Sequence, residues 1–128
     1  MSYYFTTSVA GTVDDVEQKV REALGAQGFG VLTYIDVQAT LKAKLDEDIP
    51  PYRILGACNP PFAHRALQAE NKIGTMLPCN VVVQQTGEGT VEVTAVDPIA
   101  SMQAVNNPAL TEIATEIRGK LQSIIESL

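Results

Sequence analysis

The sequence predicts an α+β fold in which a mixed sheet of about five strands and a layer of helices form a single two-layer domain over residues 1–128. Apolar residues at helical spacing alternate along the chain with short β-branched runs, in the order β-α-β-α-β-α-β-β-α. Two of these runs flank a glycine-rich turn, which is typical of a β-hairpin. The chain has 128 residues, 45% of them hydrophobic and 19% charged, and this size and composition suit one globular domain.

The first strand and the first helix have clear sequence signals. Residues 3–9 are aromatic and β-branched, which favours a strand. Thr12, with Asp15 three residues later, is a capping box and marks the first turn of a helix. Gly25 and Gly28 offer the positive φ angle with which helices commonly end. Four apolar residues recur on one face of this helix: Val13, Val16, Val20 and Leu24.

The next three elements are a strand, a short helix and another strand. Residues 29–35 form an apolar run of strand length, and we expect both faces of this strand to be covered. An apolar residue at every fourth position predicts a helix over residues 37–45. Three carboxylates follow at residues 46–48, and we expect them in solvent because negative charge is unfavourable at a helix C-terminus. Residues 52–58 alternate as a strand does.

A helix follows this strand directly. We expect Asn59 to cap it, with Pro60 and Pro61 at its first positions, where the missing N–H groups do no harm. The apolar side of the helix holds Phe62, Ala63, Ala66 and Leu67, and the opposite side holds His64, Arg65 and Gln68.

A hairpin and a long helix complete the chain. Residues 79–85 and 90–96 are the two strands of the hairpin, and glycines at 87 and 89 form its turn. Asp97 and Pro98 end the second strand, and we expect a loop after them. Asn107 then begins the final helix, whose apolar stripe comprises Leu110, Ile113, Ile117, Leu121, Ile124 and Leu128.

The charge and the composition exclude several classes of partner. Nine basic and fifteen acidic residues give a net charge of −6, and the basic residues form no cluster, so we expect no nucleic acid as a partner. No apolar stretch approaches the ~20 residues that span a bilayer, and the N-terminus lacks the pattern of a signal peptide. We therefore expect a cytoplasmic protein without a membrane partner, whose two cysteines are thiols.

Two short motifs locate a candidate site. Cys58-Asn59-Pro60 lies where a strand gives way to a helix, and Pro78-Cys79-Asn80 lies where another strand begins. If the two strands are neighbours, two thiols and two carboxamides gather at one end of the sheet. Such an arrangement can hold a small ligand or a soft metal ion.

The cysteines also have other interpretations. A thiolate at Cys58 gains from the positive end of the helix macrodipole, which would make it a nucleophile or a redox centre. Pro60 and Pro61 weaken this effect, because they lack the N–H groups that would hold an anion. A buried and unreactive thiol is the commoner fate of a cysteine in an apolar strand.

Metal binding and catalysis need more than these thiols. His64 with Cys58 and Cys79 would give three ligands, but no Cys-x-x-Cys or histidine pair is present and His64 lies on the solvent side of its helix, so we predict no metal. A cysteine nucleophile needs a base within hydrogen-bond reach, and His64 is the only histidine. Asp97 could supply a carboxylate near the same end of the sheet.

The pattern from Tyr52 to Pro60, followed by Leu77-Pro78-Cys79-Asn80 and then Asp97-Pro98, resembles the domain-of-unknown-function 302 family over nearly the whole chain. The resemblance implies a small prokaryotic α+β domain that is often a dimer and has no established activity. If the shared positions mark a site, they are Cys58, Asn59, Pro60, Pro78, Cys79 and Asn80 here. The same residues could serve only to shape the end of the sheet.

From the sequence we therefore expect a binding or interaction module, non-catalytic and homodimeric, with a small-molecule pocket near Cys58 and Cys79. The alternative is a thiol-dependent enzyme or redox sensor, and a third interpretation gives both thiols a structural role only. The sequence names no cofactor. The expected ligand-binding residues are Cys58, Asn59, Pro60, His64, Pro78, Cys79 and Asn80.

Overall fold

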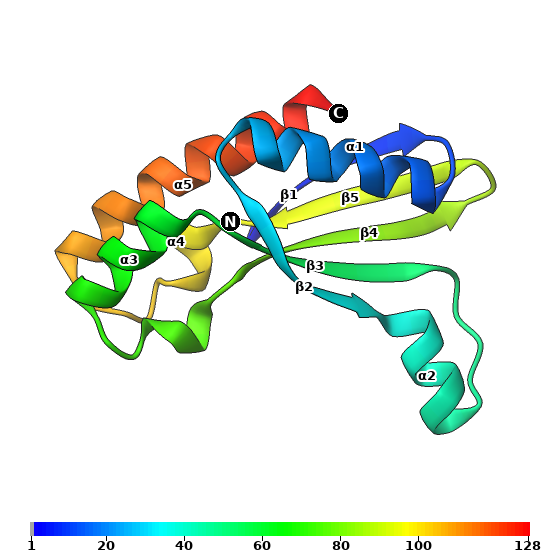
Figure 1. Ribbon diagram of the computed structural model, residues 1–128, viewed down its shortest axis with the longest axis horizontal. Helices are drawn as coiled ribbons and strands as arrows, with labels where there is room; N and C mark the ends of the chain where they lie inside the picture. The colour runs from blue at the N-terminus through cyan, green and yellow to red at the C-terminus, as the bar shows by residue number, and fades with distance from the viewer. Residues whose placement is uncertain (1) are drawn as a thin grey trace.

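The computed structural model describes residues 2–128, and within them five strands form one sheet in the order β1-β5-β4-β3-β2 (Figure 1). The fold class and the order of the main elements are those predicted. The sheet is not mixed, however, because each pairing among the described strands is antiparallel. The strands are β1 (Tyr4–Ala10), β2 (Gly30–Asp36), β3 (Tyr52–Cys58), β4 (Cys79–Gly87) and β5 (Thr90–Val96).

The antiparallel arrangement follows from where the connecting helices lie. A parallel pair of neighbours needs a crossover that packs on a face of the sheet. The connection between β2 and β3 instead contains α2 (Val37–Leu45), which projects beyond the sheet so that the chain returns beside the strand it left (Figure 1). The helix α1 (Val13–Ala26) carries the chain from one edge strand to the other, since β1 and β2 are not neighbours.

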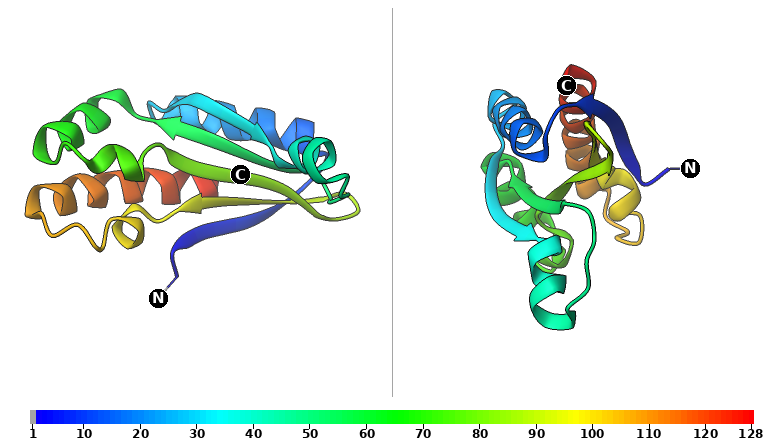
Figure 2. Two further views of the ribbon diagram at one scale, coloured as in Figure 1. Left: turned by 90° about the horizontal axis from the view of Figure 1, so that it is seen from below. Right: turned by 90° about the vertical axis from the view of Figure 1, so that its right-hand side faces the viewer.

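Two helices cover one face of the sheet. α1 and α5 (Pro108–Ser127) lie side by side across it, and both run along the strands (Figures 1 and 2). The amide of Asp15 donates to Thr12 Oγ1 over 3.1 Å, which confirms the predicted start of α1. All four residues of its predicted apolar face are buried. The main core lies between these helices and the sheet, and its strand residues are Leu55, Ala57, Cys79, Val81, Val83, Val91, Val93 and Ala95.

The other helices lie at one end of the sheet. α3 (Pro60–Ala69) and the one-turn helix α4 (Pro98–Ser101) both pack against α5. A 3-10 turn, η1 (Ile73–Met76), precedes β4. The turn η1 was not predicted, and the residues of α4 were expected to be a loop, because each segment is too short to show a helical period. These elements enclose a second apolar cluster of Ala66, Ile73, Leu110 and Ile113.

The prediction for the second strand was wrong in one respect. β2 is an edge strand, and Leu32, Tyr34 and Ile35 are exposed rather than covered. Val31 pairs with Ala57 while Thr33 pairs with Gly56, so Leu32 is an extra residue that bulges from the ladder. The carboxylates at residues 46–48 are exposed as expected, and Lys42 pairs with Asp46 and Asp48.

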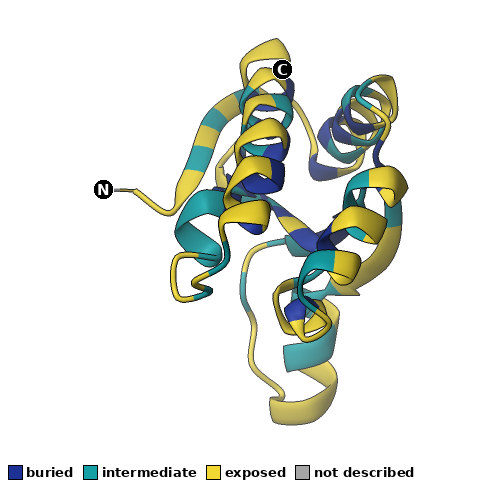
Figure 3. Cartoon of the chain, turned by 90° about the vertical axis from the view of Figure 1, so that its left-hand side faces the viewer, coloured by how far each residue is buried: buried dark blue, intermediate teal, exposed yellow. Residues whose placement is uncertain are grey.

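The burial pattern separates an outer from an inner side of each long helix. Figure 3 shows α5 and α1 with buried residues toward the sheet and exposed residues away from it. Within residues 2–128, none of the helices is both long enough and apolar enough to cross a membrane.

Candidate functional site

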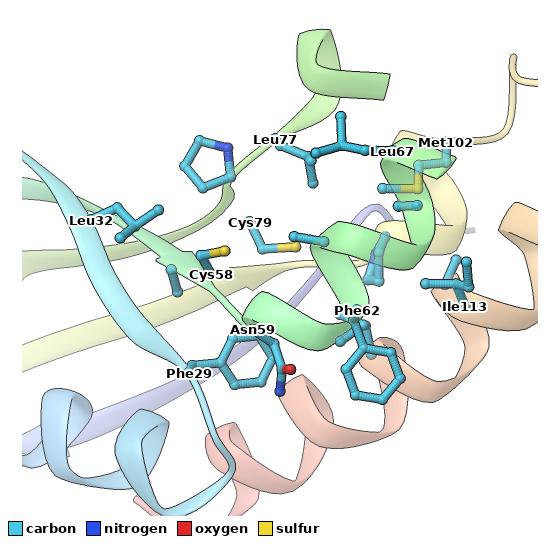
Figure 4. Close-up of a pocket in the computed structure, with 17 residues that line it drawn as sticks. Phe29, Leu32, Cys58, Asn59, Phe62, Leu67, Leu77, Cys79, Met102 and Ile113 are labelled. Carbon is cyan, nitrogen blue, oxygen red and sulfur yellow. The ribbon is translucent and has the colours of Figure 1, made fainter. Parts of the chain in front are cut away.

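The register of the sheet brings the two cysteine motifs together. Ala57 of β3 lies opposite Cys79 of β4, and Gly56 lies opposite Asn80, so Cys58 is one residue beyond the pair that contains the second cysteine. Both strands have their motif at the end of the sheet that faces α3 and α4 (Figure 1). Cys58 and Cys79 line one cavity there, and Figure 4 shows both sulfur atoms directed into it.

This cavity has a volume of about 290 Å³ and lies where the two apolar clusters meet. The sheet contributes Ala57 and the two cysteines, α3 contributes one wall, and α5 contributes the floor. Its lining residues are Phe29, Leu32, Ala57, Cys58, Asn59, Phe62, Ala63, Ala66, Leu67, Leu77, Pro78, Cys79, Pro98, Met102, Ile113, Ala114 and Ile117. Of these described residues, only Asn59 and the two thiols carry a polar side-chain group.

The two thiols differ in their surroundings. Cys79 is buried in the main core, whereas Cys58 is half-buried, and neither is in a disulfide. Burial, and to a smaller extent the nearby Cys58, raise the pKa of the Cys79 thiol from its ordinary value of 9.0 to about 11. Cys79 is therefore a protonated thiol at neutral pH and a poor nucleophile.

Asn59 occupies the N-cap position of α3, but its side chain does not cap the helix. Its Nδ2 atom donates instead to the backbone oxygen of Gln27, over 3.3 Å. Pro60 and Pro61 supply no N–H group at the start of α3, so the side chain has less to gain by turning toward the helix. The buried amide thus ties the turn between α1 and β2 to the start of α3, beside the cavity.

Pro78 lines the cavity where the chain enters β4. The bond between Leu77 and Pro78 is cis, and the proline ring lies against β3 at Gly56. A Cβ atom at position 56 would lie 2.7 Å from Pro78 Cγ and would also collide with Thr33 Oγ1. Glycine is required at position 56 because Thr33 of β2 and Pro78, the residue before β4, both lie close to the backbone of β3 there.

Three of the predicted site residues lie outside the cavity. Asn80 follows Cys79 in β4, and since side chains alternate along a strand, it is on the uncovered face of the sheet. Pro60 is exposed at the start of α3. His64 is exposed on the outer side of α3, as its helical position predicted.

The groups considered for a metal site or a catalytic base are separated. Within residues 2–128, no three side chains of His, Cys, Asp and Glu gather as metal ligands would. Asp97 is buried and already has partners: its Oδ1 accepts from the amide of Ile99 over 3.0 Å, and its Oδ2 accepts from Arg118 Nε over 3.1 Å. It caps α4 and anchors α5, and it does not line the cavity.

Several cavity residues were not among the predicted site residues. Phe62, Ala63 and Ala66 carried a signal, because they form the apolar side of their helix. Leu32 carried none: it reaches the cavity only because the bulge in β2 turns it there, and a bulge has no signature in this stretch of sequence. Met102 and Ile113 are brought in by the packing of α4 and α5.

Comparison with known proteins gives consistent results. The profile of the family described as "Domain of unknown function DUF302" matches residues 5–128. The crystal structure of an uncharacterized conserved DUF302 protein from Bacillus stearothermophilus superposes with a TM-score of 0.90 at 32% sequence identity, over 98% of each chain. No curated protein matches the sequence.

Proposed function

The chain belongs to the DUF302 family, whose role is unknown, and we propose from its cavity that it is a binding module for a small molecule held next to Cys58 and Cys79. The observation that carries the proposal is the convergence of both cysteine motifs on one apolar cavity of about 290 Å³. Ligand pockets begin at about this size and are lined mainly by apolar side chains with a few polar groups.

Binding is favoured over catalysis by the chemistry of the cavity wall. Among the described lining residues there is no carboxylate, histidine or lysine that could act as an acid or a base. The raised pKa of Cys79 makes that thiol unsuited to nucleophilic attack. The wall can enclose an apolar molecule.

An NMR titration of the full chain with indole tests this proposal. Indole has nine non-hydrogen atoms, is neutral, and matches the apolar wall. We expect saturable changes in the amide and methyl signals of Ala57, Ala66 and Ala114, which line the cavity, and unchanged signals from Ala39 in α2. Uniform weak changes over the whole chain, or no change at the cavity alanines, would contradict a ligand site here.

A thiol-based redox function is the second candidate, because two free thiols line the same cavity. Joining them in a disulfide would release two protons and two electrons to an oxidant such as a small disulfide. Treatment with oxidised glutathione, followed by mass spectrometry, tests it. A loss of two hydrogen masses that disappears in Cys58→Ser would support this function, and two free thiols after treatment would exclude it.

We also propose that two copies of the chain associate through the uncovered face of the sheet. One row of directly opposed residues crosses all five described strands on that face: Ile35, Ile54, Val82, Thr94 and Thr6. The row carries no charge, and sheets of this kind stack face to face about 10 Å apart. A second copy is a fitting occupant, because the uncharged row can lie against the same row of a second chain in a two-fold dimer.

Sedimentation velocity tests this association. The wild-type chain is expected at twice its mass of 13.7 kDa, and Val82→Asp is expected as a monomer, because the dimer would bury an unpaired charge. Thr86→Asp, at the exposed end of the same strand, is the control and should remain a dimer. Far-UV circular dichroism shows whether each variant is folded. A monomeric wild-type chain would refute the dimer.

A further inference from the structure

We propose that the cavity selects a neutral, apolar ligand of about ten to twelve non-hydrogen atoms and rejects its anionic counterpart. This inference rests on the proposed binding function and specifies the class of ligand.

The size of the cavity limits the ligand. A dry protein cavity of about 150 Å³ holds benzene, which has six carbon atoms. The cavity beside Cys58 and Cys79 has about 290 Å³. It therefore accommodates about twice as many atoms, which corresponds to a bicyclic ring system or to an alkyl chain of about ten carbons.

The wall offers no counter-charge to an anion. Within residues 2–128, the lining contains neither arginine nor lysine. The start of α3 lies at the wall, but Pro60 and Pro61 lack the N–H groups with which helix N-termini hold anions. The buried amide of Asn59 already donates to Gln27. A carboxylate in this cavity would lose its hydration without gaining an ionic partner.

Two cations lie over the ring of Phe62, which lines the cavity. Arg65 and Lys120 lie 5.2 and 5.9 Å from the centre of the Phe62 ring, and Arg65 Nη2 is 3.5 Å from Glu116 Oε1. Figure 4 shows that the ring of Phe62 is turned away from the two sulfur atoms and toward α5. Neither Arg65 nor Lys120 lines the cavity, so both are poorly placed to neutralise a ligand beside Cys79.

The route into the cavity is apolar as well. Leu32, in the bulge of β2, is 69% exposed, and Leu67 on α3 is 45% exposed, yet both line the cavity. A ligand that enters between them contacts hydrocarbon from the surface to the interior. This favours an uncharged molecule at each step of binding.

Titration calorimetry with 1-decanol and decanoate at pH 8 tests the inference, because the two ligands share their chain and differ in charge. We expect decanol to bind and decanoate to bind at least about 30-fold more weakly, since a buried carboxylate without a partner is strongly disfavoured. Ala114→Leu places three more carbons into the cavity from α5 and should weaken decanol binding at least about tenfold. Ala109→Leu, exposed on the same helix, is the matched control and should leave it unchanged.

The outcomes separate this inference from the binding function itself. If decanoate binds as tightly as decanol, the selectivity is refuted while the binding function stands. If neither decanol nor indole binds, both are refuted. If decanol binds equally to Ala114→Leu, its site is not this cavity. Ala66→Leu, which fills the cavity from α3, replaces Ala114→Leu should that variant not fold.

Discussion

The side chain of Cys79 is buried on the covered face of the sheet, in an environment that opposes its ionisation, and this links the stability of the fold to pH. Burial raises its pKa from 9.0 to about 11 in the folded chain. Between these values the unfolded chain loses the thiol proton and the folded chain keeps it. Unfolding is therefore favoured as the pH rises, and the contribution of Cys79 to stability is complete below pH 9 and lost toward pH 11.

We expect the free energy of unfolding of the wild-type chain to fall by about 2 kcal/mol more than that of Cys79→Ala between pH 8.5 and 11. Urea unfolding at a series of pH values measures the difference, in which the lysine and tyrosine contributions cancel. Cys58→Ala is the control and should retain the decline. Parallel curves for the wild-type chain and Cys79→Ala would show that the thiol titrates normally.

Among the glycines, Gly56 is the one at which an added Cβ atom would make the closest contacts. Because a Cβ atom there would collide with Thr33 and lie 2.7 Å from Pro78 Cγ, we expect Gly56→Ala to destabilise the fold by about 2–3 kcal/mol. Thermal or urea unfolding measures this. Gly30→Ala, whose Cβ would meet no atom within 4 Å, should change stability far less. Adding Thr33→Ala to Gly56→Ala should restore part of the lost stability. Equal destabilisation by Gly56→Ala and Gly30→Ala would contradict the steric argument.

Only some residues of the candidate site could be predicted from the sequence. Cys58, Asn59, Pro78 and Cys79 line the cavity because strand ends that are neighbours in a sheet must meet. Asn80 does not, because the alternation of side chains along β4 places it on the other face. The side chain of Asn59 was expected to cap α3, and its bond to Gln27 depends on a loop that is distant in sequence.

Among the elements, α2 is the one held least firmly by the rest of the fold. None of its residues, all of which are described, is buried, and Leu45 is 64% exposed. Side-chain hydrogen bonds hold its first turn: Asp36 Oδ1 accepts from the amide of Ala39, Thr40 Oγ1 donates to the backbone oxygen of Asp36, and Gln38 donates to the backbone oxygen of Ile49. A helix without a buried face depends on such bonds and on local propensity.

We therefore expect the backbone amides of residues 41–45 to exchange with solvent at least about 100-fold faster than those of α1 from Val20 to Leu24. Hydrogen exchange followed by NMR or mass spectrometry measures both helices in one sample of the full chain. Protection of α2 equal to that of α1 would mean that another surface covers it in solution, such as a second copy of the chain.

Helices with a strong apolar stripe were the elements that could be predicted best. α1 and α5 each bury the residues of the predicted stripe, apart from Leu128, which is half-buried. We predicted that both faces of β2 would be covered, and this was wrong. An apolar run shows that a segment is hydrophobic, but it does not show whether other elements pack against the strand or whether the strand lies at the edge of the sheet. Strand direction could not be predicted either, because it depends on where α2 lies.

For the whole molecule, α5 connects the two apolar clusters. Its last turns, with Leu121 and Ile124, belong to the main core, and its first turns, with Leu110 and Ile113, belong to the smaller cluster. We expect one cooperative unfolding transition as a consequence. The urea midpoints from far-UV circular dichroism and from the near-UV signal of the four tyrosines should coincide. Two separate midpoints would contradict the prediction that residues 1–128 form one domain.

The bulge at Leu32 has a further consequence for the assembly of many chains. An edge strand with a continuous row of free backbone groups is a template on which other chains can add strands and grow into fibrils. The extra residue between Val31 and Thr33 interrupts that row in β2. We therefore expect the distortion that turns Leu32 toward the cavity to disfavour edge-to-edge pairing of β2 with other chains as well.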